Sequence, residues 1–302
     1  MSLKGIDVSD NQGIINWADV AADGVKFAIL RSVRGSGKTD YQFLNNVNGC
    51  RVNGIPFDVY KYAYALNEEK SIIEAEQVVA LLKSTEIKAC TVWHDMEDKT
   101  LRALSKTQLN SIVNAFKEVV EDAGYNYGTY CNLDWYKNVL DVKSLECPFW
   151  IARYPSNEKM SISNNPNSKY MPAVKDGHEL FGWQYSSKGS VSGINGNVDL
   201  NMIYMDIDRE NSATTESYVG NNPYPVPTYT LYRGRLGMSK DYVKWLQWEA
   251  KDLGFPMDNH GGIDGSLGEY TEKVISALQV WLGLADDKKC GPKTIAALCS
   301  RY

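Results

Sequence analysis

The chain has 302 residues, of which 43% are hydrophobic and 23% are charged, a composition that is ordinary for a globular protein of about two domains. Its net charge is −5 and it has no basic run, which disfavours nucleic-acid binding. No apolar stretch approaches the roughly 18 residues that a membrane span needs, so membrane insertion is not expected.

The first residues, 1–7, contain no apolar signal core. We therefore expect synthesis in the cytosol and action after release or lysis, unless a leader precedes this sequence. The six cysteines show no CxxC or metal-ligand spacing, and the chain has three histidines. We expect neither a metal nor another cofactor, and we interpret the cysteines as mostly buried thiols.

Along the first half of the chain, short apolar strands alternate with amphipathic helices. The pattern predicts strands over 5–9, 26–32, 56–64, 90–97 and 127–131, and helices over 16–22, 40–53, 68–83, 105–123 and 133–139. Three later strands, over 149–153, 180–186 and 198–201, are not separated by clear helices. Alternation of this kind predicts a mainly parallel sheet. About eight strands over about 200 residues favour a barrel that loses its helices late.

The stretch from Cys90 to Asp98 is predicted to be a buried strand that ends in acidic residues. Because alternate residues of a strand share a face, Asp95 and Glu97 point the same way. Two adjacent carboxylates repel each other, so at least one pKa is expected to rise, as general acid catalysis requires. The alternative is a pair of surface acids that cap the following helix.

Polar and aromatic side chains recur where the predicted strands end, which is where barrels of this kind carry their chemistry. The acids are Asp7, Asp95, Glu97 and Asp199. Aromatic rings form apolar platforms for sugars, and 11% of the chain is aromatic. The predicted substrate-binding residues are Tyr62, Tyr64, Tyr130, Trp150, Gln184 and Tyr185, whereas Tyr60 and Trp93 are interpreted as core residues.

Residues 211–229 are polar and then rich in proline, which is typical of a linker. We predict a barrel domain over 1–208, a linker over 209–229 and a second domain over 230–302. In the second domain, apolar residues recur at helical spacing in 243–253 and 274–281. These patterns predict a small all-α domain.

Several motifs together resemble glycoside hydrolase family 25, the Chalaropsis-type lysozymes. In chain order they are Gly5–Ser9 with Gln12–Gly13, Tyr60–Tyr64, Asp95–Glu97, Trp150–Tyr154, Trp183–Tyr185 and Gly196–Asn201, and they cover about residues 3–208. The resemblance implies an irregular (β/α)5β3 barrel that cleaves the β-1,4 bond between N-acetylmuramic acid and N-acetylglucosamine. The loop 34–38 departs from the family, whose members often carry an acid before the glycine, and no substrate role is assigned to it.

The tail resembles the small three-helix peptidoglycan-binding-like family. The matching residues are Val243–Gln247, Leu253–Phe255, Ile263–Gly265, Gly268, Thr271, Ala277–Gln279 and Cys290–Thr294. This resemblance implies bacterial peptidoglycan as the partner. The alternative is a helical cap or a dimerisation module without sugar affinity. Together, the tail and the absent signal favour a phage or prophage endolysin, and a secreted bacterial autolysin fits nearly as well.

Two carboxylates are the usual catalytic pair of glycosidases. Glu97 is the predicted general acid, and Asp95 is its partner, which orients a substrate acetamido group so that the configuration is retained. The rival is inversion, with Asp7 or Asp199 activating water. A non-catalytic wall-binding protein would use the same cleft, and an amidase or peptidase would need a zinc or Cys/His site, for which Cys131 has no evident histidine partner.

Overall fold

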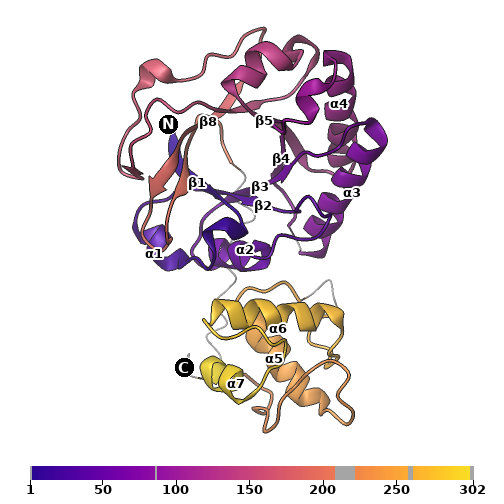
Figure 1. Cartoon of the computed structure of the whole chain (residues 1–302). Coiled ribbons are helices and arrows are strands. Elements are labelled where there is room, and N and C mark those ends of the chain that lie inside the picture. Colours follow the sequence, from indigo (N-terminus) through magenta and orange to yellow (C-terminus); the bar gives the residue numbers. More distant parts are fainter. Residues whose placement is uncertain (1, 86, 208–221, 258–260, 300–302) are drawn as a thin grey trace.

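The computed structural model describes residues 2–85, 87–207, 222–257 and 261–299. Residues 3–203 form a closed barrel of eight strands, as predicted (Figure 1). The barrel strands are β1 (Leu3–Val8), β2 (Ala28–Arg31), β3 (Phe57–Tyr62), β4 (Thr91–Asp95), β5 (Asn126–Asn132), β6 (Phe149–Ala152), β8 (Leu180–Ser190) and β9 (Val198–Ile203). The two-residue strand β7 (Met160–Ser161) pairs with the far end of β8.

The strands from β1 to β6 are parallel neighbours in chain order, and β6 continues in parallel to β8. Strand β9 closes the barrel by pairing antiparallel with both β8 and β1. The closing strand therefore begins at the end of the barrel where β1 to β6 finish. This reversal determines which end of β9 reaches the site.

Helices follow each of the first four strands: α1 (Trp17–Ala22), α2 (Phe43–Val52), α3 (Glu68–Ser84) and α4 (Lys106–Asp122). A short π-helix over Trp135–Val139 follows β5. Helix α4 shows why these segments cover the sheet. Its buried residues, Leu109, Ile112, Val113, Phe116 and Val120, recur at helical spacing on one face. Burial stabilises the fold by roughly 1.5–3 kcal/mol for each such large side chain.

The core has two layers, one between the sheet and the helices and one inside the barrel. The inner layer contains Phe27, Trp93 and Phe181, and it fills the barrel beneath the site. Trp93 is therefore a core residue, as predicted. It needs Gly128 on the neighbouring strand, because a Cβ there would lie 2.3 Å from the indole ring. These side chains pack the interior of the barrel.

The tail consists of α5 (Lys240–Asp252), α6 (Glu269–Trp281) and α7 (Pro292–Cys299), which confirms the three-helix prediction. It has its own core, which includes Trp245, Leu246 and Leu278. Helix α6 lies against α2 of the barrel, where Leu44 contacts the tail's core. None of the described helices has the length and apolar character needed to cross a membrane.

The tail begins earlier than predicted. Asn222 donates hydrogen bonds to the Trp245 carbonyl and to Glu249, and Tyr224 and Tyr229 pack against the tail's core. Residues 222–229 therefore belong to the tail and not to a linker, which corrects the boundary at 230. The rest of the expected linker, 209–221, lies outside the described residues.

The tail also contains an internal duplication that the sequence analysis missed. Gln247 on α5 holds the loop 264–266 through hydrogen bonds of 2.8–3.1 Å, and Gln279 on α6 holds the loop 287–289 through hydrogen bonds of 2.8–3.0 Å. Both loops pass through positive φ at the same place, at Gly265 and at Lys288. The two halves of the tail therefore repeat one helix-and-loop unit.

Candidate active site

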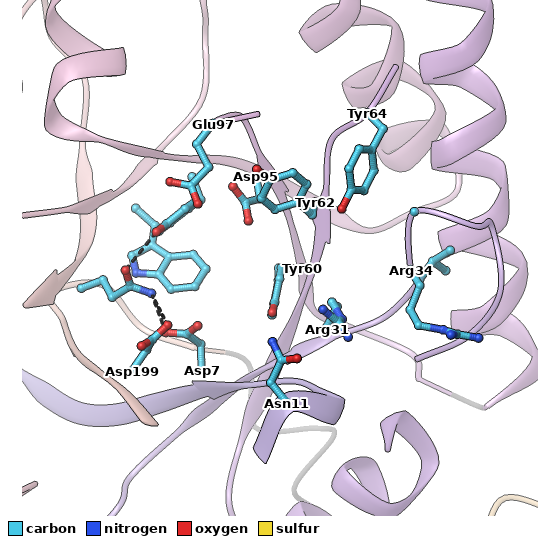
Figure 2. A pocket seen from close by; sticks show the side chains of 15 residues that line it. Asp7, Asn11, Arg31, Arg34, Tyr60, Tyr62, Tyr64, Asp95, Glu97 and Asp199 are labelled. Atoms are coloured by element: carbon cyan, nitrogen blue, oxygen red, sulfur yellow. Dashed lines mark hydrogen bonds between the residues drawn. The ribbon is translucent and has the colours of Figure 1, made fainter. Parts of the chain in front are cut away.

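A cavity of about 400 Å³ lies at the open end of the barrel, within the size range of sites for small ligands. Figure 2 shows Glu97 and Asp95 on one side of it, Asp7 and Asp199 together on another, and Tyr62 and Tyr64 along a third. The predicted residues that line it are Asp7, Tyr62, Tyr64, Asp95, Glu97, Tyr130, Trp150, Gln184 and Asp199. The structure therefore brings nine of the predicted residues together.

Tyr185 is the predicted substrate-binding residue that the structure places elsewhere. It is fully buried in the core between sheet and helices, where its ring packs edge-on against Trp183. Its neighbour Gln184 faces the cavity, and adjacent strand residues point to opposite faces. The prediction for Tyr185 was wrong because a Trp-Gln-Tyr sequence can send only its middle residue, or its two outer residues, inward.

Asp95 ends β4, and Glu97 lies two residues beyond it. Burial raises the pKa of Asp95 well above its ordinary value, and the neighbouring Glu97 and Asp7 raise it further. Burial also raises the pKa of Glu97, against a hydrogen bond from Asn132 that lowers it. The expected pKa rise is confirmed, but its largest cause is loss of water rather than mutual repulsion.

One oxygen of Asp95, Oδ1, is buried and has no hydrogen-bond partner among the described residues. Such an atom carries a desolvation cost that a bound donor would remove. The side chain is 5% exposed and lines the cavity, so a bound donor such as a ligand N–H would satisfy this oxygen.

Asp7 and Asp199 face each other across the antiparallel pairing of β1 and β9. Asp199 is near the start of its strand and Asp7 is near the end of its own, and the reversed direction of β9 brings both to one rim. Their side chains are hydrogen-bonded to each other. Burial raises the pKa of Asp7 to about 6 and that of Asp199 to about 8, and the charge of Asp7 contributes to the second rise. The two carboxyls therefore share a proton near neutral pH.

Amide side chains fix this acid pair. Gln184 donates to Asp7 at 2.8 Å, and Asn201 donates to the same oxygen at 2.7 Å. The carbonyl oxygen of Gln184 accepts hydrogen bonds from the Tyr130 hydroxyl at 2.9 Å and from the Tyr154 hydroxyl at 2.6 Å. Both hydroxyls orient the glutamine, which leaves its nitrogen free to donate to the acid pair.

Trp150 completes the same network. Its indole N–H donates to the side-chain oxygen of Asn201 at 2.9 Å, and its ring packs 4.4 Å from that of Tyr130. Trp150 is 2% exposed and Tyr130 is 5% exposed. Both line the floor of the cavity, where they support the acid pair and leave little ring area for a ligand.

The loop 34–38, to which no role was assigned, contributes Arg34 and Gly35 to the cavity wall. The Arg34 guanidinium stacks on Tyr41 at 3.6 Å. The cavity's other arginine, Arg31, makes ion pairs with Asp10 and Asp40. The cavity is thus lined by four acids and two arginines, of which Arg31 is already paired with acids outside the lining.

Several site residues were missed by the sequence analysis. Tyr60 lines the cavity although it was interpreted as core, and strand alternation with Tyr62 was the signal that could have found it. Asn201 alternates with Asp199 in the same way. Asn132 stands at the end of β5, where polar residues gather in such barrels. Tyr154 lies an even number of residues after Trp150 and ends the Trp150–Tyr154 motif, so the same alternation could have found it, although it lies beyond the end of β6.

The shared proton of Asp7 and Asp199 makes the stability of the barrel depend on pH. Their pKa values are raised on folding, so the stabilisation is complete below the unfolded value near 4 and is lost as pH rises through 6 to 8. We expect Asp199→Asn to raise the free energy of unfolding at pH 9 by about 1–3 kcal/mol and to change it little at pH 5. Thermal unfolding at both pH values measures this, and equal shifts at both would contradict the shared proton.

Among the residues that the structure describes, no group of three or more His, Cys, Asp or Glu side chains could hold a metal ion. We expect EDTA to leave the activity within about twofold of its untreated value, because neither the sequence spacing nor the described clusters offer a ligand set. Turnover of purified cell walls before and after chelation measures this. Loss of activity that zinc restores would overturn the prediction.

Comparison with known proteins agrees with the geometry. Residues 6–194 match the profile described as "Glycosyl hydrolases family 25", and residues 239–298 match that of a "Putative peptidoglycan binding domain". The autolytic lysozyme of Clostridium acetobutylicum is 26% identical over 295 residues, which cover 98% of this chain and 78% of that protein.

Two solved structures share the barrel. The modular autolysin LytC of Streptococcus pneumoniae, in complex with a synthetic peptidoglycan ligand, is 25% identical with a TM-score of 0.56, covering 67% of this chain and 47% of LytC. A lysozyme of Streptomyces coelicolor is 23% identical with a TM-score of 0.55, covering 68% of this chain and 93% of that one. This chain thus spans less than half of LytC. The family profile covers most of the chain in the order of its barrel strands, and the chain belongs to glycosyl hydrolase family 25.

Proposed function

We propose that the enzyme is an N-acetylmuramidase that hydrolyses the β-1,4 bond between N-acetylmuramic acid and N-acetylglucosamine in bacterial peptidoglycan. The observation that carries this proposal is the pair of a buried Asp95 and a half-buried Glu97 in a cavity walled by tyrosines. The lysozyme and autolysin relatives and the peptidoglycan ligand of LytC support the same substrate. Paired carboxyls flanking a sugar-sized cavity are what glycoside hydrolysis requires.

Glu97 protonates the leaving glycosidic oxygen. Its pKa is raised by burial, which keeps the carboxyl protonated closer to neutral pH. The hydrogen bond from Asn132 fixes its direction. After departure of the N-acetylglucosamine 4-hydroxyl, the Glu97 carboxylate removes a proton from the incoming water.

Asp95 receives the substrate's acetamido N–H on its partnerless Oδ1. Burial raises the pKa of Asp95, and the neighbouring Glu97 raises it further. A donated hydrogen bond stabilises the Asp95 carboxylate and so lowers its pKa, which favours the charged form that orients the acetamido group. The oriented acetamido oxygen then attacks the anomeric carbon, and hydrolysis of the resulting oxazolinium ion gives net retention.

Inversion is the competing mechanism, with Asp7 or Asp199 as the base that activates water. The hydrogen bonds from Gln184 and Asn201 occupy one oxygen of Asp7 and hold it in place. This pair suits electrostatic stabilisation of a developing positive charge at the anomeric carbon. Retention forms the β-anomer first and inversion forms the α-anomer first, so the initial anomer separates the two mechanisms.

Digestion of purified cell walls tests the enzyme class. We expect new reducing ends to appear without new free amino groups. New amino groups would indicate an amidase or peptidase, and wall binding without either product would indicate a non-catalytic binding protein. Both of these outcomes would contradict the proposal.

The tail is proposed to hold the enzyme on the wall. Two modules that bind one polymer raise the effective concentration of each near its substrate. We expect a chain ending at residue 207 to keep its turnover of soluble glycan fragments within about threefold. On intact walls at low enzyme concentration it should lose about tenfold or more. Measuring both substrates with both chains tests this, and equal activity on walls would contradict it.

Dimerisation through the tail is the alternative. In that case the isolated tail, residues 222–302, stays in the supernatant when walls are sedimented. Light scattering would then show a dimer for the full chain and a monomer for the chain ending at 207. We expect instead co-sedimentation of the isolated tail.

The proposed substrate lies outside the cytoplasmic membrane, so we propose that the enzyme acts on the wall after release or lysis. A phage or prophage endolysin is our preferred setting, and a secreted autolysin is the alternative. The gene's neighbours distinguish them, because an endolysin gene stands among phage genes.

A further inference from the structure

Lys61 is a buried charged residue that the catalytic scheme leaves unused. Its side chain is 1% exposed, although the residue lies on β3 between the cavity residues Tyr60 and Tyr62. Strand alternation turns it away from the cavity and toward α3, where it meets Glu74 at 3.1 Å. Burial lowers the pKa of Lys61, and Glu74 opposes that change. A buried ion pair contributes little net stability, so its presence here calls for another explanation.

The pair holds the backbone of the segment that carries two cavity tyrosines. The Lys61 ammonium donates to the Tyr62 carbonyl at 2.5 Å as well as to Glu74. The two Glu74 oxygens each lie 3.3 Å from the Tyr64 backbone N–H, which donates to them. Tyr64 lies beyond the end of β3, so Glu74 takes the place of a sheet partner. The ion pair thus connects both tyrosines to α3.

The two rings form one wall of the cavity, as Figure 2 shows. Their centroids are 4.9 Å apart and the Tyr64 ring is 45% exposed. The Tyr62 hydroxyl is hydrogen-bonded to Asp98, and Gly35 packs so closely on Tyr64 that a Cβ there would lie 2.7 Å from the ring. The backbone attachment to α3 and the neighbours of the rings together allow one orientation of this wall.

We propose that Lys61 and Glu74 are positioning residues that fix the Tyr62–Tyr64 wall on which a sugar ring of the substrate rests. The proposal rests on the proposed function, since it assigns the wall to glycan binding. Neither residue touches the substrate. Their effect on the wall therefore belongs to substrate binding, whereas the charge of Lys61 also lowers the pKa of Asp95.

The test compares kcat and KM on soluble peptidoglycan fragments. The double substitution Lys61→Met with Glu74→Leu removes both charges together, so neither is left buried alone. We expect KM to rise about tenfold, because the wall has to be reordered on binding. Loss of the Lys61 charge also raises the pKa of Asp95, so kcat is compared at each enzyme's own pH optimum, where it should stay within about threefold. Glu74→Gln retains an acceptor for the Tyr64 N–H and should keep KM within about twofold.

Ser71→Ala is the matched control on the same helix. It removes the 2.7 Å hydrogen bond from Ser71 to the Ile112 carbonyl, which joins α3 to α4 and does not involve the tyrosines. We expect it to lower the melting temperature without changing KM. If the double variant does not fold, Glu74→Ala decides, because it removes the acceptor of the Tyr64 N–H together with the ion-pair partner of Lys61, which keeps its hydrogen bond to the Tyr62 carbonyl. It should raise KM at least threefold.

Each outcome either supports or overturns the positioning role of Lys61 and Glu74. An unchanged KM in the folded double variant overturns the positioning role. If Glu74→Ala has to replace the double variant, an unchanged KM in Glu74→Ala has the same meaning. An equal rise in KM for Ser71→Ala also overturns the positioning role. Both results would leave the proposed function standing, because the unaltered enzyme would still cleave the fragments. Failure of the unaltered enzyme to cleave them would overturn both proposals.

Discussion

The Glu97→Gln enzyme is expected to lose about a thousandfold in turnover of purified cell walls, within the range for removal of a general acid. Glutamine has the same shape and still accepts the hydrogen bond that Asn132 donates to Glu97. It has no acidic proton for the leaving oxygen and cannot later act as a base. The rate of reducing-end release, compared at equal enzyme concentration, measures the effect.

The control must show that the loss is chemical. Glu121→Gln makes the same substitution at an exposed position on α4 and should leave the rate unchanged. The Glu97→Gln enzyme should also keep its melting temperature and co-sediment with walls. A folded variant with full turnover would exclude Glu97 as the acid.

Asp95→Asn is expected to reduce turnover by about a hundredfold to a thousandfold. Asparagine retains the shape but not the charge that accepts the acetamido N–H and stabilises the oxazolinium ion. It also removes the carboxyl whose charge interacts with that of Glu97, so the upper limb of the pH–rate profile should move. A loss below about fivefold would show that Asp95 has no part in the chemistry.

The unaltered enzyme supplies the companion measurement for Asp95. Participation of the acetamido group predicts that the new reducing end first forms as the β-anomer. Proton NMR recorded before mutarotation distinguishes the anomers. Initial formation of the α-anomer would establish inversion and would assign water activation to Asp7 or Asp199.

The barrel could be predicted because each strand leaves a local signal. Short apolar runs such as 28–31 and 57–62 are separated by helices with clear stops, and this alternation specifies a parallel sheet. The direction of β9 leaves no local signal, because the residue pattern of a six-residue strand does not reveal whether it pairs in parallel or antiparallel. The meeting of Asp7 and Asp199 therefore depends on barrel closure, which the sequence pattern does not encode locally.

Most of the candidate site could be predicted because its acids lie at strand ends. Tyr185 was misassigned since aromatic character does not reveal which face of a strand a residue occupies, and Gln184 takes the inward place. The role of Lys61 was invisible for a related reason. Its partner Glu74 lies 13 residues away on a helix, and only packing of α3 on β3 brings the two together. Long-range pairing of this kind needs the fold.

The identity of the severed bond tests the central claim most directly. Purified walls are digested with the enzyme, the products are reduced with borodeuteride, and the labelled sugar is identified by mass spectrometry. The account predicts labelled N-acetylmuramitol at the new ends, and no such label with the Glu97→Gln enzyme. Labelled N-acetylglucosaminitol, or release of peptides without any labelled sugar, would contradict it.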